Sequence, residues 1–182
     1  MKKFIYSLVL IFCLLPLFAI SQPGSWKLIG KAGEWKNTIT CVGLADKFYT
    51  IENSGALYSS DIAGNWTQIG KEDFINTKYF AAAGQKLYTI EKDGSLFEIN
   101  SANGSWKLLG TKGEYINTIA CVGLNGKIYS IDNAGALYVT YNDGSWEQIG
   151  KNDFVNTRRI IAVGKNLVSL EKDGSLYLIN VE

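Results

Sequence analysis

The 182-residue sequence contains no histidine, only two prolines and three cysteines, and its 18 basic and 17 acidic residues nearly cancel. Without histidine it lacks the commonest general base near neutral pH and the commonest metal ligand. Three cysteines are too few for a disulfide-stapled scaffold. The balanced charge gives no electrostatic footprint for nucleic acid. We therefore expect a protein that depends on packing, is not an enzyme, and needs no cofactor or metal.

Residues 1–21 have the pattern of a signal peptide. Lys2 and Lys3 precede an almost wholly apolar stretch over residues 4–18, and the small residues of Ala19-Ile20-Ser21 suit a signal peptidase. A retained membrane anchor is the alternative, but the stretch is short for a span and no second one follows. Cleavage removes two of the 18 basic residues, which leaves 16 against 17 acidic ones. We expect residues 22–182 to be one secreted domain, extracellular or periplasmic, with no membrane insertion.

The most informative positive feature is a period of 40 residues. Tryptophan recurs at Trp26, Trp66, Trp106 and Trp146. Between these positions lie short runs rich in β-branched and aromatic residues, separated by glycine and asparagine turns, and no segment keeps a helical period. A period of this size with strand-like sequence indicates a β unit that needs neighbours to bury its faces.

Every repeat has the same order of parts. The tryptophan run is followed by an acidic–aromatic pair, by Asn-Thr, and by three strand-like runs, which in the third repeat cover residues 119–122, 127–131 and 136–139. Asn125-Gly126 is the clearest hairpin signal, because both residues accept the positive φ of a tight primed turn. The sequence therefore predicts an all-β protein, a β-propeller of four blades of about 40 residues with four antiparallel strands each.

The order of the strands also predicts how the ring closes. If the Asn-Thr strand is innermost, the tryptophan strand is outermost, and residues 175–180 form the third strand of the last blade. We expect the N-terminal strand around Trp26 to join that blade and close the ring, which would remove exposed sheet edges. Because four blades is the low end for this architecture, a larger ring made by two chains is the alternative.

The repeats alternate in type. The first and third have one extra residue before the aromatic and a matched cysteine; these residues are Gly33, Gly113, Cys41 and Cys121. Because the corresponding residues Phe80 and Ile160 are apolar, we interpret the cysteines as buried free thiols, with a disulfide or a metal site as the alternative. The second and fourth repeats have a basic residue, Lys78 or Arg158, which we interpret as a solvated charge; an anion site at the channel mouth is the alternative.

A resemblance to a known family follows from these motifs. The pattern Trp106-x-x-Leu109-Gly110, the aromatic Tyr115, and the later runs 127–131 and 135–138 resemble the repeat of tachylectin-type propeller lectins and, more loosely, tectonin repeats. The resemblance implies binding of N-acetylated sugars between blades, near the segment after the Ile-Gly pair. By position, the implied ligand-binding residues are Glu34, Trp35, Asn37, Asp73, Phe74, Asn76, Glu114, Tyr115, Asn117, Asp153, Phe154 and Asn156.

The chemistry of those positions suits carbohydrate independently of the resemblance. An aromatic face packs on the C–H side of a sugar ring, while carboxylates and amides hold its hydroxyls. The alternative is that the aromatics fill the core and Asn-Thr satisfies turn backbone groups. We interpret the four periodic tryptophans as structural and leave them out of the site.

Three functions stay open from the sequence. The first is a secreted lectin-like protein whose repeated weak sites bind glycans or glycan-coated surfaces with avidity. The second is a propeller scaffold for protein partners, with or without oligomerisation. The third is a glycosidase-like enzyme built on carboxylates, which repeated acids favour least. Asn65 and Asn103 lie in glycosylation acceptor motifs, which matter only in a secretory pathway that attaches such glycans.

Overall fold

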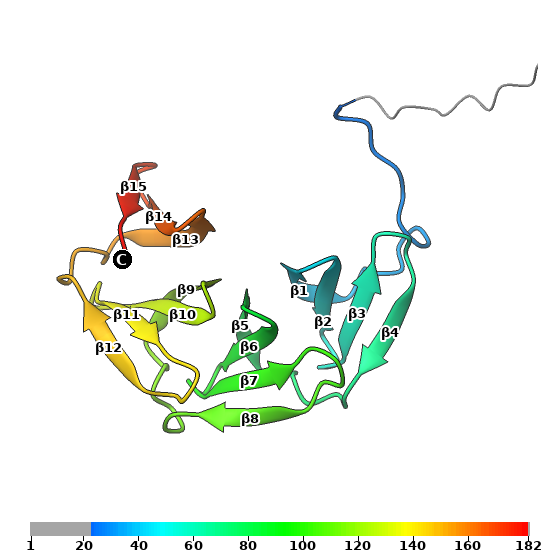
Figure 1. Ribbon diagram of the computed structural model, residues 1–182, viewed down its shortest axis with the longest axis horizontal. Coiled ribbons are helices and arrows are strands. Elements are labelled where there is room, and N and C mark those ends of the chain that lie inside the picture. The colour runs from blue at the N-terminus through cyan, green and yellow to red at the C-terminus, as the bar shows by residue number, and fades with distance from the viewer. Residues whose placement is uncertain (1–22, 182) are drawn as a thin grey trace, which may run out of the picture.

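The computed structural model describes residues 23–181, and within them every regular element is a β-strand (Figure 1). The predicted signal peptide lies outside the described residues. The strands are β1 (Thr38–Leu44), β2 (Lys47–Glu52), β3 (Leu57–Asp61), β4 (Trp66–Ile69), β5 (Thr77–Ala83), β6 (Lys86–Glu91), β7 (Leu96–Asn100), β8 (Trp106–Leu109), β9 (Thr118–Leu124), β10 (Lys127–Asp132), β11 (Leu137–Thr140), β12 (Trp146–Ile149), β13 (Thr157–Val163), β14 (Asn166–Glu171) and β15 (Leu176–Ile179). No helix in this range has the length and apolar character needed to cross a membrane.

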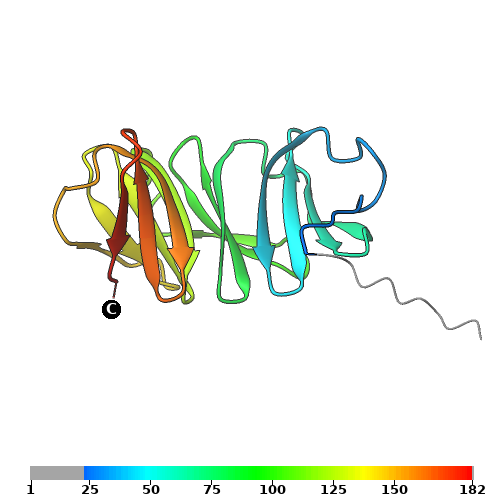
Figure 2. The same cartoon turned by 90° about the horizontal axis from the view of Figure 1, so that it is seen from above.

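The strands form four antiparallel sheets, one per repeat, arranged as the blades of a propeller (Figures 1 and 2). Within each blade the strands follow chain order, with the Asn-Thr strand innermost and, in the first three blades, the tryptophan strand outermost. The tight turn between β9 and β10 has Asn125 at φ 51° and Gly126 at φ 76°, as the hairpin signal predicts. The all-β propeller class and the four repeated blades are thus confirmed.

Apolar layers between neighbouring blades form the core. The layer between the first and second blades contains Ile51, Leu57, Phe74, Leu87 and Ile99, and comparable clusters lie at the next two boundaries. Apart from Phe74, which lies in the loop before β5, these residues lie on strands and point to one face of their sheet, because successive side chains of a strand point to opposite faces. Each blade is therefore stabilised mainly by its neighbours, as expected for repeat proteins.

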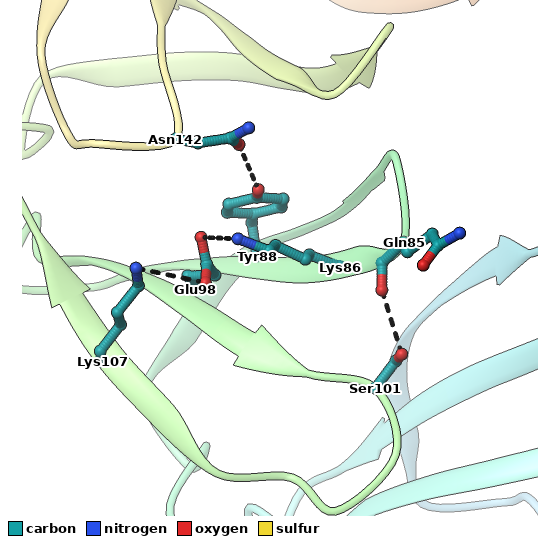
Figure 3. Close-up of polar contacts among 7 residues, drawn as sticks. All are labelled: Gln85, Lys86, Tyr88, Glu98, Ser101, Lys107 and Asn142. Carbon is teal, nitrogen blue, oxygen red and sulfur yellow. Dashed lines mark hydrogen bonds and ion pairs between the residues drawn. The ribbon is translucent and has the colours of Figure 1, made fainter.

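A polar network joins the strands of the second blade to each other and to the third (Figure 3). Glu98 on β7 lies 2.8 Å from Lys86 Nζ and 3.4 Å from Lys107 Nζ, so it ties β6 and β8 to the strand between them. The Tyr88 hydroxyl donates to Asn142 Oδ1 of the third blade at 3.1 Å, and burial raises the pKa of Tyr88 to about 12. Because the Tyr88–Asn142 hydrogen bond can form in only one arrangement of the two blades, the network helps to fix how the second and third blades pack.

The predicted closure of the ring by the N-terminal strand is wrong for this chain as it stands. Residues 23–30 form no strand, Trp26 is 91% exposed, and the last sheet has three strands instead of four. The blades form an open arc, with the first and last blades at its two ends (Figure 1). The packing of each blade on the next sets the curvature of the arc, and this curvature leaves the segment around Trp26 away from β15.

The two described cysteines are both free thiols, but only one is covered. Cys121 packs against the core between the second and third blades, and burial raises its pKa to about 12. Cys41 is exposed, so the prediction of a buried thiol is wrong there, because no blade covers its face of the first sheet. Lys78 is exposed yet not simply solvated, since its Nζ donates to the Thr118 carbonyl of the next blade at 2.8 Å.

Candidate functional site

Each blade has one open cleft at the same place, beside the loop that precedes its innermost strand. All twelve residues predicted as ligand-binding line these clefts, three in each. Glu34, Trp35 and Asn37 line the first cleft, and Asp73, Phe74 and Asn76 the second. The third and fourth clefts hold Glu114, Tyr115, Asn117, Asp153, Phe154 and Asn156. The fold therefore brings together, within each blade, the residue types that the sequence singled out.

The acidic residue of the first three clefts is fixed by a tryptophan from the outer strand of the same blade. The indole Nε1–H of Trp66 donates to Glu34 Oε1 at 2.8 Å, and that of Trp106 donates to Asp73 Oδ2 at 3.0 Å. Trp146 donates in the same way to Glu114. These bonds join residues 32 or 33 positions apart in the chain, so each cleft combines two successive sequence repeats.

The alternation of Glu and Asp follows from loop length. In the longer loops of the first and third blades, Glu34 Oε2 accepts the Lys31 amide and Glu114 Oε2 accepts the Thr111 amide, each at 3.0 Å. The Lys31 amide, followed by the Trp66 indole, lowers the pKa of Glu34. The shorter loop of the second blade needs only the shorter aspartate to reach its tryptophan.

The aromatic residues next to these acids are less exposed to a ligand than the predicted site requires. Phe74 and Tyr115 are buried and belong to the layers between blades, and the Tyr115 hydroxyl shares a 3.0 Å hydrogen bond with Thr140 Oγ1. Trp35 and Phe154 are only partly buried. The alternative that these aromatics fill the core therefore describes Phe74 and Tyr115.

The tryptophans left out of the predicted site form the exposed aromatic walls instead. Trp66, Trp106 and Trp146 are 46–48% exposed, and each lines a cleft. Each packs edge-to-face on an aromatic of the third strand, with centroids 5.4 Å apart for Tyr58–Trp66 and 5.0 Å for Phe97–Trp106. The sequence did contain the information that places these tryptophans outside. Ile69 faces the core, and Trp66, three positions earlier on the same strand, must point to the opposite face because side chains alternate along a strand.

A second carboxylate, which the predicted site also lacks, stands at the end of the second strand of each blade. Glu52, Glu91 and Glu171 line their clefts and accept the hydroxyl of the threonine that begins the innermost strand, at 2.6, 2.9 and 2.9 Å. Burial raises the pKa of Glu91. In the third blade Asp132 takes this place and instead accepts the amides of its own turn.

The fourth cleft differs because its tryptophan wall is missing. It contains Asp153, Asn156, Glu171 and Tyr177, but no outer strand lies beside β15, and no indole reaches Asp153 among the described residues. Its volume is about 600 Å³, against about 260 Å³ for the first cleft, 490 Å³ for the second and 240 Å³ for the third.

The three complete clefts can each hold a small polar ligand against an aromatic wall. Each combines a half-exposed tryptophan with at least two carboxylates and at least one side-chain amide. With volumes of about 240–490 Å³ they lie at the small end of ligand sites. In the part of the chain that the structure describes, no three His, Cys, Asp or Glu residues are grouped to hold a metal ion.

Comparisons with known proteins place the chain by fold alone. No protein-family model and no curated protein sequence matches it. Among solved structures, BamB from Moraxella catarrhalis is similar with 13% identity and a TM-score of 0.57, over 79% of this chain and 44% of BamB. The computationally designed Ika4 protein has 15% identity and a TM-score of 0.59, over 87% of this chain and 99% of Ika4. The WD40 β-propeller domain of Doa1 has 12% identity and a TM-score of 0.57, over 80% and 51% of the two chains. The chain thus has the β-propeller fold and spans less than half the length of BamB.

Proposed function

We propose that this protein is a secreted carbohydrate-binding propeller with one weak site per blade. The observation that carries the proposal is the repetition of one polar–aromatic cleft, since all twelve positions implied by the lectin resemblance line these clefts. Secretion rests on the signal-peptide pattern of residues 1–21.

The tryptophan, the acidic residue and the side-chain amide of a cleft have separate roles in this proposal, as the second cleft illustrates. The exposed side of Trp106 stacks on the apolar side of a sugar ring. Asp73 is already oriented by the indole and keeps free lone pairs for sugar hydroxyls, and the Asn76 amide supplies both a donor and an acceptor. An acetamido group, as in N-acetylated sugars, offers the matching donor and acceptor. Several such weak sites on one rigid frame gain avidity on a glycan-coated surface.

A glycan array probed with the purified protein tests the proposal. We expect retention on a subset of glycans, loss of that retention in Trp106→Ala combined with Trp66→Ala and Trp146→Ala, and partial retention when the same positions become Phe. Ile62→Ala is the matched control, because Ile62 is 75% exposed on a turn and lines no cleft. Retention that survives the triple alanine change with unchanged circular dichroism would refute the assignment of the clefts.

A protein-binding scaffold is the second candidate, and one observation favours it. Ile75, Ile116 and Val155 occupy the same loop position in three blades and are each about half exposed. Such a row of apolar side chains suits a protein surface better than a sugar. An empty glycan array, together with a partner whose binding is lost on changing these three residues to serine, would replace the first proposal by this one.

A further inference from the structure

The boundary between the second and third blades shows how an even-numbered blade (the second or fourth) contacts the odd-numbered blade (the first or third) that follows it. Lys78 Nζ and the Tyr79 hydroxyl both donate to the Thr118 carbonyl, at 2.8 and 3.1 Å, and the Tyr115 amide donates to the Gly94 carbonyl at 2.8 Å. The inner strands also approach so closely that a Cβ on Gly123 would lie 2.0 Å from the Ala82 carbonyl oxygen. Only glycine fits there.

The same contact residues are repeated at the two free ends of the arc, where no neighbouring blade covers them within residues 23–181. A Cβ added to Gly43, which corresponds to Gly123, would meet no atom within 4 Å, and Ala162 corresponds to Ala82 on the other end. The Trp35 amide and the Gly174 carbonyl correspond to the bonded Tyr115 and Gly94, yet no bond joins them within residues 23–181. The first and fourth blades therefore carry, on their free faces, the residues that form the two sides of this boundary.

The end faces are apolar where a blade boundary would cover them. Leu176 is 67% exposed, whereas its counterpart Leu96 in the second blade is completely buried. Ile161 and Val163 are likewise about half exposed, at positions where the second blade buries two alanines. On the other end, Cys41 lies open at the position where Cys121 is packed into the core.

The last blade also lacks an outer strand that the chain contains elsewhere. Residues 24–30 repeat the sequence of the tryptophan strand, but within residues 23–181 they belong to no sheet. Gly104, just before β8 of the second blade, meets Gly70, just after β4 of the first blade, so that a Cβ on Gly104 would lie 2.6 Å from the Gly70 nitrogen. Cβ atoms built on the corresponding Gly24 and Gly150 meet nothing within 4 Å. The register of β7 with β8 predicts that Lys27 would lie opposite Leu178, as Lys107 lies opposite Glu98.

We propose that two copies of this chain close one eight-bladed ring, in which the N-terminal tryptophan strand of each copy becomes the outer strand of the other copy's last blade. Trp26 of the second copy then donates its indole hydrogen to Asp153 and completes the fourth cleft, as Trp66, Trp106 and Trp146 complete the others. Both closing boundaries are of the even-to-odd type already present between the second and third blades. A two-fold symmetry axis through the centre of the ring, perpendicular to its plane, makes the two closing boundaries identical.

Closure by a second copy does not require the two ends of one chain to meet. The packing of successive blades leaves the first and last blades at opposite ends of the arc (Figures 1 and 2). Joining the first and last blades within one chain would require blades to shift against each other at boundaries that hold close contacts, such as Gly123 with Ala82. The proposed ring does not depend on the proposed function. Only the statement that the completed fourth cleft binds a sugar rests on that function.

Mass measurement and a disulfide pair test the proposal on the purified protein. We expect light scattering to give twice the mass of one chain. The double variant Lys27→Cys with Leu178→Cys should oxidise to a covalent dimer on a non-reducing gel, because directly opposed antiparallel residues lie about 4.5–5.5 Å apart at Cα, within disulfide reach. Each single variant is the control for reaction with the native thiols. A disulfide within one chain at single-chain mass would overturn the two-copy ring, and so would the absence of any disulfide.

Gly43→Val tests the closing boundary separately from folding. Because nothing lies near Gly43 within one chain, the variant should keep the circular dichroism spectrum and lose at least tenfold in dimer affinity, whereas Gly123→Val should fail to fold normally. Thiol labelling of the native dimer should find Cys41 as protected as Cys121, with Cys41 exposed again in Gly43→Val. A dimer that ignores Gly43→Val and leaves Cys41 reactive would contradict the proposal. Since none of these measurements uses a sugar, failure of the ring and failure of sugar binding can be told apart.

Discussion

Tyr115 gives the sharpest test of which aromatic residues hold the fold and which face a ligand. Its ring is buried in the layer between the second and third blades, its hydroxyl is bonded to Thr140, and its amide is bonded to Gly94. Truncating a buried aromatic to alanine costs about 3–5 kcal/mol, and an unpaired buried hydroxyl adds to that cost. Tyr115→Ala should therefore remove roughly a third or more of a typical folding free energy of about 5–15 kcal/mol.

Urea unfolding followed by circular dichroism measures this loss, with thermal unfolding as a second readout. At about 2–4 °C per kcal/mol for a domain of this size, the midpoint should fall by about 10 °C. Tyr115→Phe should cost less, about 1–3 kcal/mol, because it keeps the buried ring but leaves the buried Thr140 hydroxyl without its partner. The adjacent Ile116→Ala is the matched control, since Ile116 is half exposed and should change stability by less than about 0.5 kcal/mol. A Tyr115→Ala protein within about 1 kcal/mol of the wild type would show that the ring is not part of the core.

Two further predictions concern buried ionisable groups. Burial raises the pKa of Tyr88 and Tyr115 to about 12. Between about pH 10 and pH 12 the unfolded chain therefore loses these protons while the folded protein keeps them, so the free energy of unfolding should be unaffected up to about pH 10 and fall above it. Absorbance titration of the folded protein should show both tyrosines ionising at a higher pH than free tyrosine. Burial likewise raises the pKa of Glu91, so its charged form is a cost above the unfolded pKa; Glu91→Gln keeps an oxygen for the Thr77 hydroxyl and should stabilise the protein near neutral pH. That gain, measured by urea unfolding, should shrink as the pH falls and Glu91 itself becomes neutral, and a gain independent of pH would contradict this explanation.

The sequence predicted the repeated parts of the fold because they depend on local chemistry. The turn at Asn125-Gly126 needs only two residues that accept positive φ, and the Asn-Thr strands become innermost because every repeat has the same order. The twelve cleft residues were predictable for the same reason, since their spacing within each repeat fixes where the loop brings them.

The closure of the ring and the exposure of single aromatics were not predictable in this way. Closure depends on the angle between blades, which many contacts such as Gly123 with Ala82 set together. Tyr115 and Phe74 lie in loops without strand alternation, so nothing local showed that they point into the core. Trp66, in contrast, lies on a strand whose alternation does place it outside, and the prevalence of tryptophan in cores concealed that.

The number of saccharides bound per chain tests the central claim most directly, because repeated clefts predict repeated binding. Calorimetric titration with a monosaccharide chosen from the glycan array should give about four sites per chain in the closed ring, and about three in Trp26→Ala, which leaves the fourth cleft without its wall. A single site per chain, or binding unchanged when all four tryptophans become alanine in a protein that still folds, would contradict the account.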